Sequence, residues 1–269
     1  MNKVTTVLRT LESEISRYEF QKAVDFYKGD KHIRKFPTKQ MFSSLIFGQV
    51  TNGFSIREIK HGLEANSHRL YHNGLSPIKR STFADALAKR DYRIFVMLHE
   101  QLMETALALA GRKKRRFENP LRIIDSTMIE VHVNRFPWAN FRQTKGGMKL
   151  HVSYDPETAL IEPTLESIVV EYAYPERLLY DKAADSDPLR ERLAERGVEL
   201  IAAHRKNRTK AKRQDGRAQR RLKRRWRVEN LIHRLKIFRR LRVRYETQSM
   251  MFRAFVHLGC ILILLKEFA

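Results

Sequence analysis

The pattern of apolar residues changes near residue 118, and this change limits the folds that the chain can adopt. Before it, apolar residues recur at helical intervals, as Phe95, Leu98 and Leu102 do. After it come short runs rich in β-branched residues, which are typical of strands: residues 121–132, 148–154, 165–170, 178–181 and 199–203. We therefore expect a helical N-terminal domain, residues 1–118, followed by an α/β domain, residues 119–269.

The order of the expected elements indicates a mixed sheet. Three strands follow one another directly, and a strand–helix–strand unit comes next. Its helix begins at Asp187 and Pro188 and ends at Gly197. Further helices are expected at residues 226–238 and 250–265. Successive strands followed by such a unit predict an α/β fold, here a mixed five-stranded sheet with helices packed on it.

Positive charge is concentrated in one part of the chain. The chain has 53 Lys and Arg against 30 Asp and Glu, a net charge of +23, and residues 204–245 hold 19 of these cations with only two acids. Such an excess implies a polyanionic partner: DNA, RNA or an anionic membrane. Residues 206–221 are also consistent with a solvated tail. Downstream, Trp226, Leu231 and Leu235 recur at helical spacing and predict a helix with one packed face and one basic face.

A membrane is the weaker of these partners. The longest apolar run, Leu258–Leu265, is shorter than the ~18–20 residues that a spanning helix needs. The first residues contain no apolar core of a signal peptide. The single cysteine, Cys260, excludes a disulfide framework and fits a reducing compartment. We expect a cytoplasmic protein that binds nucleic acid and no membrane.

Three acids stand where acids are unusual. Asp125 lies in an apolar strand, Asp181 ends another, and Glu229 lies in the basic helix. A carboxylate in an apolar strand costs several kcal/mol unless it is paired or binds a metal. Salt bridges are one explanation, for example from Glu229 to Arg225 or His233, four residues away on either side. The other is a Mg²⁺ site, in which two ions activate a water or a 3′-hydroxyl for attack on a phosphodiester.

The residues around these acids resemble a known family. Arg225, Glu229 and Lys236 match the Arg-x3-Glu-x6-Lys signature of DDE transposases from bacterial insertion sequences, whose catalytic domain is RNase H-like. Residues 1–168 resemble the insertion-sequence-four family, including Asp-Ser-Thr at 125–127 and the segment 136–151. Residues 177–269 are similar to the insertion-sequence-five family, including the segments 181–190, 204–208, 224–229 and 256–265. The chain is therefore expected to be a hybrid or an internally deleted member, joined near residues 168–177.

The resemblance implies a role for individual residues. Asp125, Asp181 and Glu229 would be the catalytic triad and hold Mg²⁺ or Mn²⁺. Arg225 and Lys236 would contact DNA, although Lys236 is also consistent with a solvated surface lysine. The remaining DNA-contact residues that we expect are Arg224, Arg239, Arg240 and Trp138. Trp138 would stack on a base or pack in the protein, and His151 and Trp226 are expected to be structural.

The resemblance also implies an activity. The chain would bind the terminal inverted repeats with its helical domain, cleave a strand at each end, and join the freed 3′-hydroxyl to target DNA. It would work in the bacterial nucleoid as a synaptic homodimer. Two alternatives stay open: an impaired remnant that only binds DNA, and a basic nucleic-acid-binding protein with structural acids. The link between the expected third and fourth strands favours the remnant. Only seven residues lie between Val170 and Leu178, whereas a crossover between parallel strands normally needs about a dozen.

Overall fold

The structure is a computed structural model. It describes residues 3–51, 55–112, 121–131, 140–142, 145–156, 161–164, 175–209, 211, 214–242 and 249–268. Trp138 and the expected third strand, residues 165–170, lie outside the described residues.

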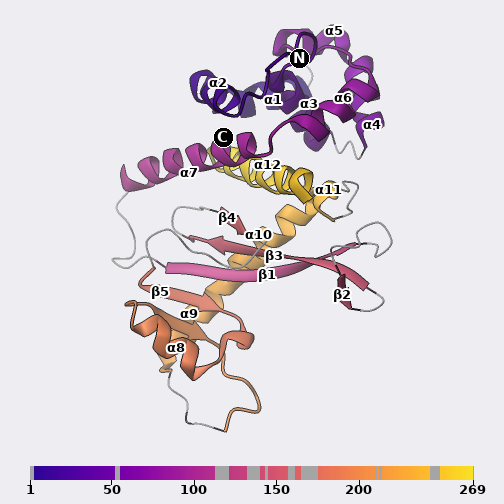
Figure 1. The fold of residues 1–269 in the computed structure, drawn as a ribbon. Helices are drawn as coiled ribbons and strands as arrows, with labels where there is room; N and C mark the ends of the chain where they lie inside the picture. The colour runs from indigo at the N-terminus through magenta and orange to yellow at the C-terminus, as the bar shows by residue number, and fades with distance from the viewer. Residues whose placement is uncertain are drawn as a thin grey trace. The chain divides into compact units, whose positions relative to one another are not determined.

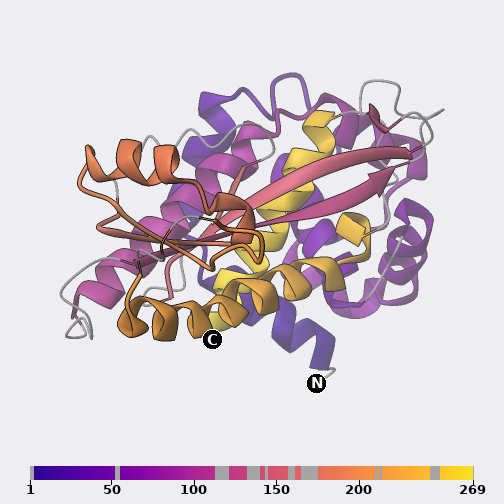
Figure 2. The ribbon, with the colours of Figure 1, turned by 90° about the horizontal axis from the view of Figure 1, so that it is seen from below.

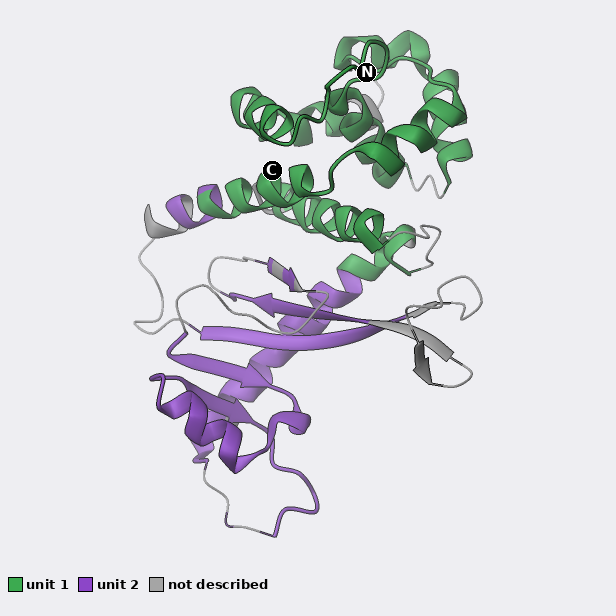
Figure 3. Ribbon diagram, viewed as in Figure 1, with its two compact units in different colours: residues 1–104, 235–269 green, residues 105–234 purple. Residues whose placement is uncertain are grey.

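The chain forms two compact units (Figure 3). Unit 1 comprises residues 1–104 and 235–269, and unit 2 comprises residues 105–234. This division differs from the expected domains, because the chain leaves the helical unit before residue 118 and returns to it at Leu235. The apolar C-terminal helix explains the return, since its buried residues belong to the core of unit 1.

The described part of unit 1 is helical (Figure 1). Its elements are α1 (Lys3–Ser13), α2 (Arg17–Phe26), α3 (Thr38–Val50), α4 (Ile56–Ala65), α5 (Ser67–Leu70), the 3-10 turn η1 (Tyr71–Asn73), α6 (Arg80–Lys89), most of α7 (Arg93–Arg112), the end of α10 (Trp226–Ile237), α11 (Arg239–Arg242) and α12 (Ser249–Phe268).

Local sequence signals fix the helix ends of unit 1 and aromatic residues fill its core. Ser55 caps α4: its Oγ accepts from the Glu58 N–H at 3.1 Å, and the Glu58 carboxylate accepts from the Ser55 N–H at 3.1 Å. Phe42 lies in the core, with its ring centroid 5.3 Å from that of Phe20 and 5.9 Å from that of Phe95. Helix α3, which carries Phe42, is buried on nearly every side.

Helix α12 is long and apolar enough to cross a membrane by length and composition alone, over Ser249–Lys266. The expected apolar run Leu258–Leu265 is thus part of a longer helix. Most of this span is buried within the protein, as in the core helices of folded domains. Cys260 lies in it and is fully buried, which raises the pKa of its thiol.

Two histidines form a buried pair in unit 1. Nδ1 of His99, on α7, lies 3.3 Å from Nδ1 of His257, on α12, and both side chains are buried. Burial lowers the pKa of both imidazoles, and each feels a further positive group: His257 for His99, and Arg253 for His257. The pKa of His257 falls to about 4.

The described residues of unit 2 form a mixed sheet of six strands. They are β1 (Leu121–Val131), β2 (Asn140–Arg142), β3 (Lys145–Tyr154), β4 (Ile161–Thr164), β5 (Arg177–Tyr180) and β6 (Glu199–Ala202), in the order β2-β3-β1-β5-β6 with β4 paired to β3. Strand β3 is antiparallel to β1 and β4. Strand β5 is parallel to β1 and β6. The mixed α/β class is confirmed, but the expected five strands are not, because β2 adds a short strand that pairs with the start of β3.

Helices cover both faces of the parallel part of the sheet (Figures 1 and 2). The helix α8 (Asp187–Ala194) begins at Asp187 and Pro188 as predicted, and its Leu189 packs with Leu178 and Leu200 on one face. The 3-10 turn η3 (Lys182–Ala184) follows β5, and α9 (Gly216–Leu222), the turn η4 (Lys223–Arg225) and α10 follow β6.

The packed face of α10 differs from the expected one. Val228 and Leu231 are buried, whereas the Trp226 side chain, expected in the core, is 59% exposed. Trp226 is the first residue of α10, directly after η4. Trp226 and Leu231 lie five residues apart in this helix, which at 3.6 residues per turn places them ~140° apart around the axis, so they cannot share a face.

The described part of β4 is Ile161–Thr164, and β5 begins at Arg177. The expected third strand, residues 165–170, and most of the chain between it and β5 lie outside the described residues. The short link between Val170 and Leu178 therefore stays a prediction.

We expect acid to destabilise the protein through the His99–His257 pair. Below about pH 6.5 the unfolded chain protonates these histidines and the folded chain does not, so the free energy of unfolding falls as the pH drops towards 4. The loss at pH 5 should reach about 2 kcal/mol for each histidine. Urea unfolding at pH 8 and pH 5 measures it. The double variant His99→Leu/His257→Leu should lose this pH dependence, whereas His61→Leu, at an exposed histidine of α4, should keep it.

Candidate active site

Two aspartates stand at the same level on neighbouring parallel strands. Strands β1 and β5 pair in register up to Ile123 and Leu179. Asp125 and Asp181 each follow two residues later, and the backbone of Asp181 is still extended, with φ −76° and ψ 177°. Paired residues of parallel strands share a face, and side chains alternate between faces. The register therefore puts both carboxylates on the face of Ile123 and Leu179, opposite α8.

Tyr180 packs on the α8 side of the sheet, against Ala184 and Leu200. Burial raises the pKa of its hydroxyl, and the negative charges of Asp181 and Asp125 raise it further.

Arg225 connects the third acid to the first. Its Nη2 lies 3.4 Å from each carboxylate oxygen of Asp125 and 3.2 Å from Oε1 of Glu229. Arg225 ends η4 and Glu229 lies in the first turn of α10, four residues on, so both side chains point to the same side. The Asp125 side chain is 15% exposed and that of Glu229 is 56% exposed. The three groups therefore form a site that opens to solvent at Glu229.

The chemistry of this site suits a hard cation, but its present geometry does not enclose one. The three acids offer only carboxylate oxygens, the ligands that Mg²⁺ and Ca²⁺ prefer. Within the described ranges, no group of three or more His, Cys, Asp or Glu side chains is close enough together to hold a metal ion. The positive charge that Asp125 and Glu229 face is the guanidinium of Arg225.

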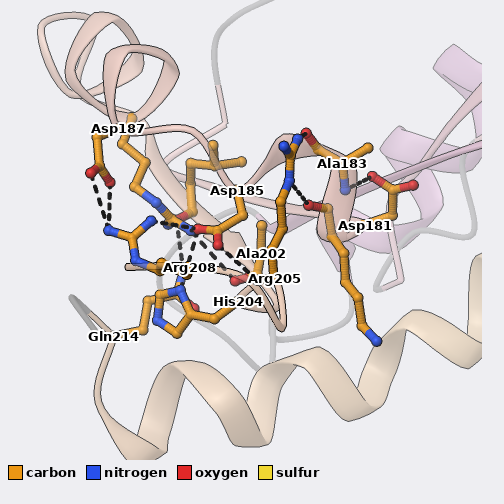
Figure 4. Close-up of polar contacts among 12 residues, drawn as sticks. Asp181, Ala183, Asp185, Asp187, Ala202, His204, Arg205, Arg208 and Gln214 are labelled. Carbon is orange, nitrogen blue, oxygen red and sulfur yellow. Dashed lines mark hydrogen bonds and ion pairs between the residues drawn. The ribbon is translucent and has the colours of Figure 1, made fainter. Parts of the chain in front are cut away.

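A second polar cluster holds the chain around Asp181 (Figure 4). Its centre is Asp185, whose side chain is only 1% exposed. Oδ1 of Asp185 lies 2.9 Å from Nη2 of Arg190, 3.1 Å from Nη1 of Arg208 and 3.2 Å from Nδ1 of His204. Oδ2 accepts from the Arg205 N–H at 2.9 Å. We call these five residues the Asp185 cluster.

The hydrogen bonds of the Asp185 cluster outweigh the cost of burying its carboxylate. Burial by itself raises the pKa of Asp185. The N–H of Arg205 and the side chains of Arg190, His204 and Arg208 lower it more, so the pKa falls to about 2. Asp185 is therefore ionised across the physiological range and stabilises the folded state by about 2 kcal/mol.

The Asp185 cluster reaches Asp181 through the backbone of η3. The Arg205 guanidinium donates to the carbonyl of Lys182 at 3.1 Å and to that of Ala183. The Ala183 N–H in turn donates to Oδ1 of Asp181 at 2.9 Å, so Asp181 caps η3 with its side chain. The loop after β6 thereby fixes the orientation of an acid at the end of β5.

The structure describes the other predicted DNA-contact residues only in part. Arg224 lies in unit 2 and is half-buried, whereas Lys236, half-exposed, belongs to unit 1. Arg240 is a correction: its side chain is buried, and its guanidinium lies 4.8 Å from the Phe255 ring centroid, so it packs in unit 1 and is not presented to DNA. The side chain of Arg239 and the whole of Trp138 lie outside what the structure describes.

Sequence reasoning missed the Asp185 cluster as a part of the site. A signal was present, because the segments 181–190 and 204–208 carry Asp185, Arg190, His204, Arg205 and Arg208. These segments contribute to the family resemblance, and Arg205 and Arg208 contribute to the charged window, but the pattern assigns none of the five residues to the site. Nothing in a linear pattern says that cations of this window turn inward to a buried acid.

Comparison with known proteins gives two domain matches and one relative. A family model described as a transposase DDE domain matches residues 159–265, and one described as a domain of unknown function (DUF4372) matches residues 3–76. The chain is 29% identical over 170 residues, 62% of its length, to a protein of Geobacillus stearothermophilus described as a probable transposase for insertion sequence element IS5377. It covers 42% of that relative's length. No solved structure matches the chain.

We expect the single substitution Asp185→Asn to destabilise the protein strongly. Asp185→Asn keeps the shape but removes the charge that Arg190 and Arg208 face, and should lower the free energy of unfolding by about 3 kcal/mol. Asp215→Asn is the matched control: Asp215 caps α9 from an exposed position, and Asn caps a helix equally well. Urea unfolding of the full chain measures both. Equal stability of the two variants would contradict the role of Asp185.

Proposed function

We propose that this chain is a DDE transposase of an insertion sequence, as the match of residues 159–265 to a transposase DDE domain supports, and that unit 2 is its nuclease core. The proposed substrate is double-stranded DNA, both the terminal inverted repeats of an element and its target. The proposed reaction is hydrolysis of one strand at each element end, followed by attack of the freed 3′-hydroxyl on the target.

One observation supports the proposal: Arg225 joins two of the three acids, and the register of the sheet sets the third level with the first. The register of β1 and β5 brings Asp125 level with Asp181, and Arg225 contacts both Asp125 and Glu229. A structural salt bridge alone needs one acid and one base. A further carboxylate on the neighbouring strand adds repulsion and no stability, so its presence favours a binding or catalytic role.

We also propose that the fold of unit 2 is RNase H-like. The strand order β4-β3-β1-β5-β6, with β3 antiparallel and the others mutually parallel, supports this proposal. Helices on both faces of the parallel strands, with the acids near the carboxyl ends of β1 and β5, agree with the position of sites in open α/β sheets.

DDE transposases use divalent metal ions, and the donor set of this site fits one. We propose Mg²⁺, which Mn²⁺ can replace, held by Asp125, Asp181 and Glu229. A bound divalent ion supplies Lewis-acid activation of the attacking oxygen and stabilises the leaving oxygen of the phosphodiester. We propose that the protein acts in the bacterial cytoplasm, where it takes up Mg²⁺ and binds the DNA of the nucleoid.

The protein's own residues then have separate tasks. The β1–β5 pairing and the Asp185 cluster position Asp125 and Asp181. Arg225 neutralises Asp125 and Glu229 while no other cation is bound, which limits the repulsion between the carboxylates. A bound divalent cation would take over this neutralisation of Asp125 and Glu229. The Arg225 guanidinium would then be available to a DNA phosphate, whose oxygens match its geometry.

The distribution of positive charge indicates which other residues contact DNA. We propose that Arg224, Lys236, Arg239 and Trp138 contact DNA beside Arg225, and that two copies of the chain act together at paired element ends. Residues 204–245, with their 19 Lys and Arg, supply the phosphate contacts. Arg240 has no part in this proposal, since it is buried.

A second candidate, a remnant that only binds DNA, rests on one observation. In the described part of the chain the acids do not enclose a metal-sized position. The DDE match, in contrast, extends across residues 168–177, where the chain was expected to be joined. Metal-dependent cleavage separates the two functions directly.

We expect Asp125→Asn, Asp181→Asn and Glu229→Gln each to abolish Mg²⁺-dependent cleavage of DNA that carries the element ends. Each variant should bind this DNA at least as tightly as the wild type, because it loses a negative charge that faces phosphate. Glu195→Gln, at the exposed end of α8, is the control and should cleave normally. Cleavage by the Glu229→Gln protein, or none by the wild type, would refute the assignment.

Arg225→Gln should separate metal binding from catalysis. Removal of the guanidinium leaves Asp125 and Glu229 without their cation, so Mn²⁺ should bind the DNA-free protein more tightly, by about tenfold. Cleavage should nevertheless fall, because a phosphate contact is lost. Arg220→Gln, at an exposed arginine of α9, should change neither. Calorimetric titration with Mn²⁺ measures the affinity, and weaker binding by Arg225→Gln would show that Arg225 does not compete with the metal.

A further inference from the structure

Unit 1 contains a wide basic groove. It has a volume of about 1630 Å³ and is formed by α1, α2, the start of α3, and α5 with η1. Among the described residues that line it, those able to carry positive charge are Arg9, Arg17, Lys39, His68, Arg69 and His72, and Glu12 is the one acid. All of them lie in residues 3–76, the part that matches a domain of unknown function.

Lys39 is a cation inside this groove without an ion pair. Its Nζ lies 5.0 Å from the ring centroid of Phe20 and 5.6 Å from that of Phe42. Burial lowers the pKa of Lys39, and the neighbouring Arg17 acts in the same direction, while Glu12 opposes them. No carboxylate of the described residues forms an ion pair with its amine. A partly desolvated ammonium group is costly without an anion, so this position favours the binding of one.

Tyr71 places an aromatic ring beside the cations. It begins η1, its side chain is 61% exposed, and its ring centroid lies 3.7 Å from that of His72. A large exposed aromatic ring on a basic surface is the arrangement on which proteins stack unpaired bases. Tyr71 thus adds a base-binding element to a groove whose cations suit phosphates.

We propose that this groove binds a segment of single-stranded DNA, with phosphates at Lys39, Arg17 and Arg69 and a base on Tyr71. The concave shape favours a single strand: a duplex carries its phosphates on a wide convex surface, which can reach the rim of a groove, whereas a single strand can enter it and approach Lys39. Bases of a single strand are also free to stack.

This inference rests on the proposed function for the identity of its ligand. Hydrolysis of one strand at an element end leaves a strand end that can separate from its complement. The groove would hold such an end by contacts that do not depend on sequence. It thereby gives a specific task to a part of the chain that the three acids do not explain.

The test measures binding of a labelled oligo(dT) of about ten nucleotides to the full chain by fluorescence anisotropy. Excess unlabelled duplex DNA is present to occupy the basic residues 204–245. Lys39→Met and Arg69→Gln should weaken binding and reduce the slope of log affinity against log salt by about 0.7 each, the value for one phosphate contact on a single strand. Tyr71→Leu should weaken binding about tenfold and leave the slope unchanged.

Two matched controls lie outside the groove. Lys79→Met changes an exposed lysine before α6, and Tyr18→Leu changes a tyrosine of α2 whose side chain is 73% exposed. Both proteins should bind the oligonucleotide as the wild type does. Equal losses in the controls and the groove variants would show that the effects are not those of a defined site.

Photo-crosslinking gives a second, independent measurement. An oligonucleotide with 4-thiothymidine should crosslink to peptides that contain residues 68–74, and an excess of the same sequence as duplex should not prevent this. Crosslinks confined to residues 204–245, or complete competition by the duplex, would overturn the proposal. A chain that cleaves element ends but does not crosslink in the groove refutes only this inference, whereas crosslinking without cleavage refutes only the proposed function.

Discussion

The parallel pairing of β1 with β5 is the interaction on which unit 2 depends. It joins the antiparallel strands β1, β3 and β4 to the β5–α8–β6 segment, which is otherwise separate in sequence. Ile123 and Leu179 meet in this pairing and are fully buried. A shift of the register by one residue would turn these side chains to the opposite face and separate Asp125 from Asp181. The packing of the apolar core therefore also sets the geometry of the acids.

The basic residues of this chain have two different roles. Several described arginines of residues 204–245 bind other parts of the protein. Arg208 pairs with Asp185, Arg225 pairs with Asp125 and Glu229, the Arg205 guanidinium donates to the carbonyls of η3, and Arg240 is buried. Guanidinium groups suit this task because they stay charged and donate several hydrogen bonds in fixed directions. The charge available to a polyanion is therefore smaller than the charge counted along the sequence. Only the structure distinguishes the arginines that build the site from those available to phosphates.

Unit 1 combines two distant parts of the chain. Its last helix, α12, is apolar along most of its length and is buried among the N-terminal helices, where His257 pairs with His99. The basic groove lies among other helices of the same unit. A helix of this composition in isolation resembles a membrane span, and its burial in unit 1 removes that apolar surface from water.

The sequence by itself determined much of the local structure. The cap at Ser55, the start of α8 at Asp187 and Pro188, and the strands around Asp125 follow from short-range preferences of the residues and are present in the structure. The family resemblance also predicts that the three acids act as a group, and this stays a prediction. These features depend on neighbours in the chain, so a linear pattern contains the information.

Tertiary structure decided the rest, because it depends on residues far apart in sequence. The exposure of Trp226 and the burial of Arg240 were not visible in the pattern. The same holds for the partners of Asp185, which come from a loop about 20 residues later, and for the return of residues 235–269 to unit 1. Composition fixes how much charge and apolar surface a chain carries. Which of these groups meet is fixed only when strands pair and helices pack.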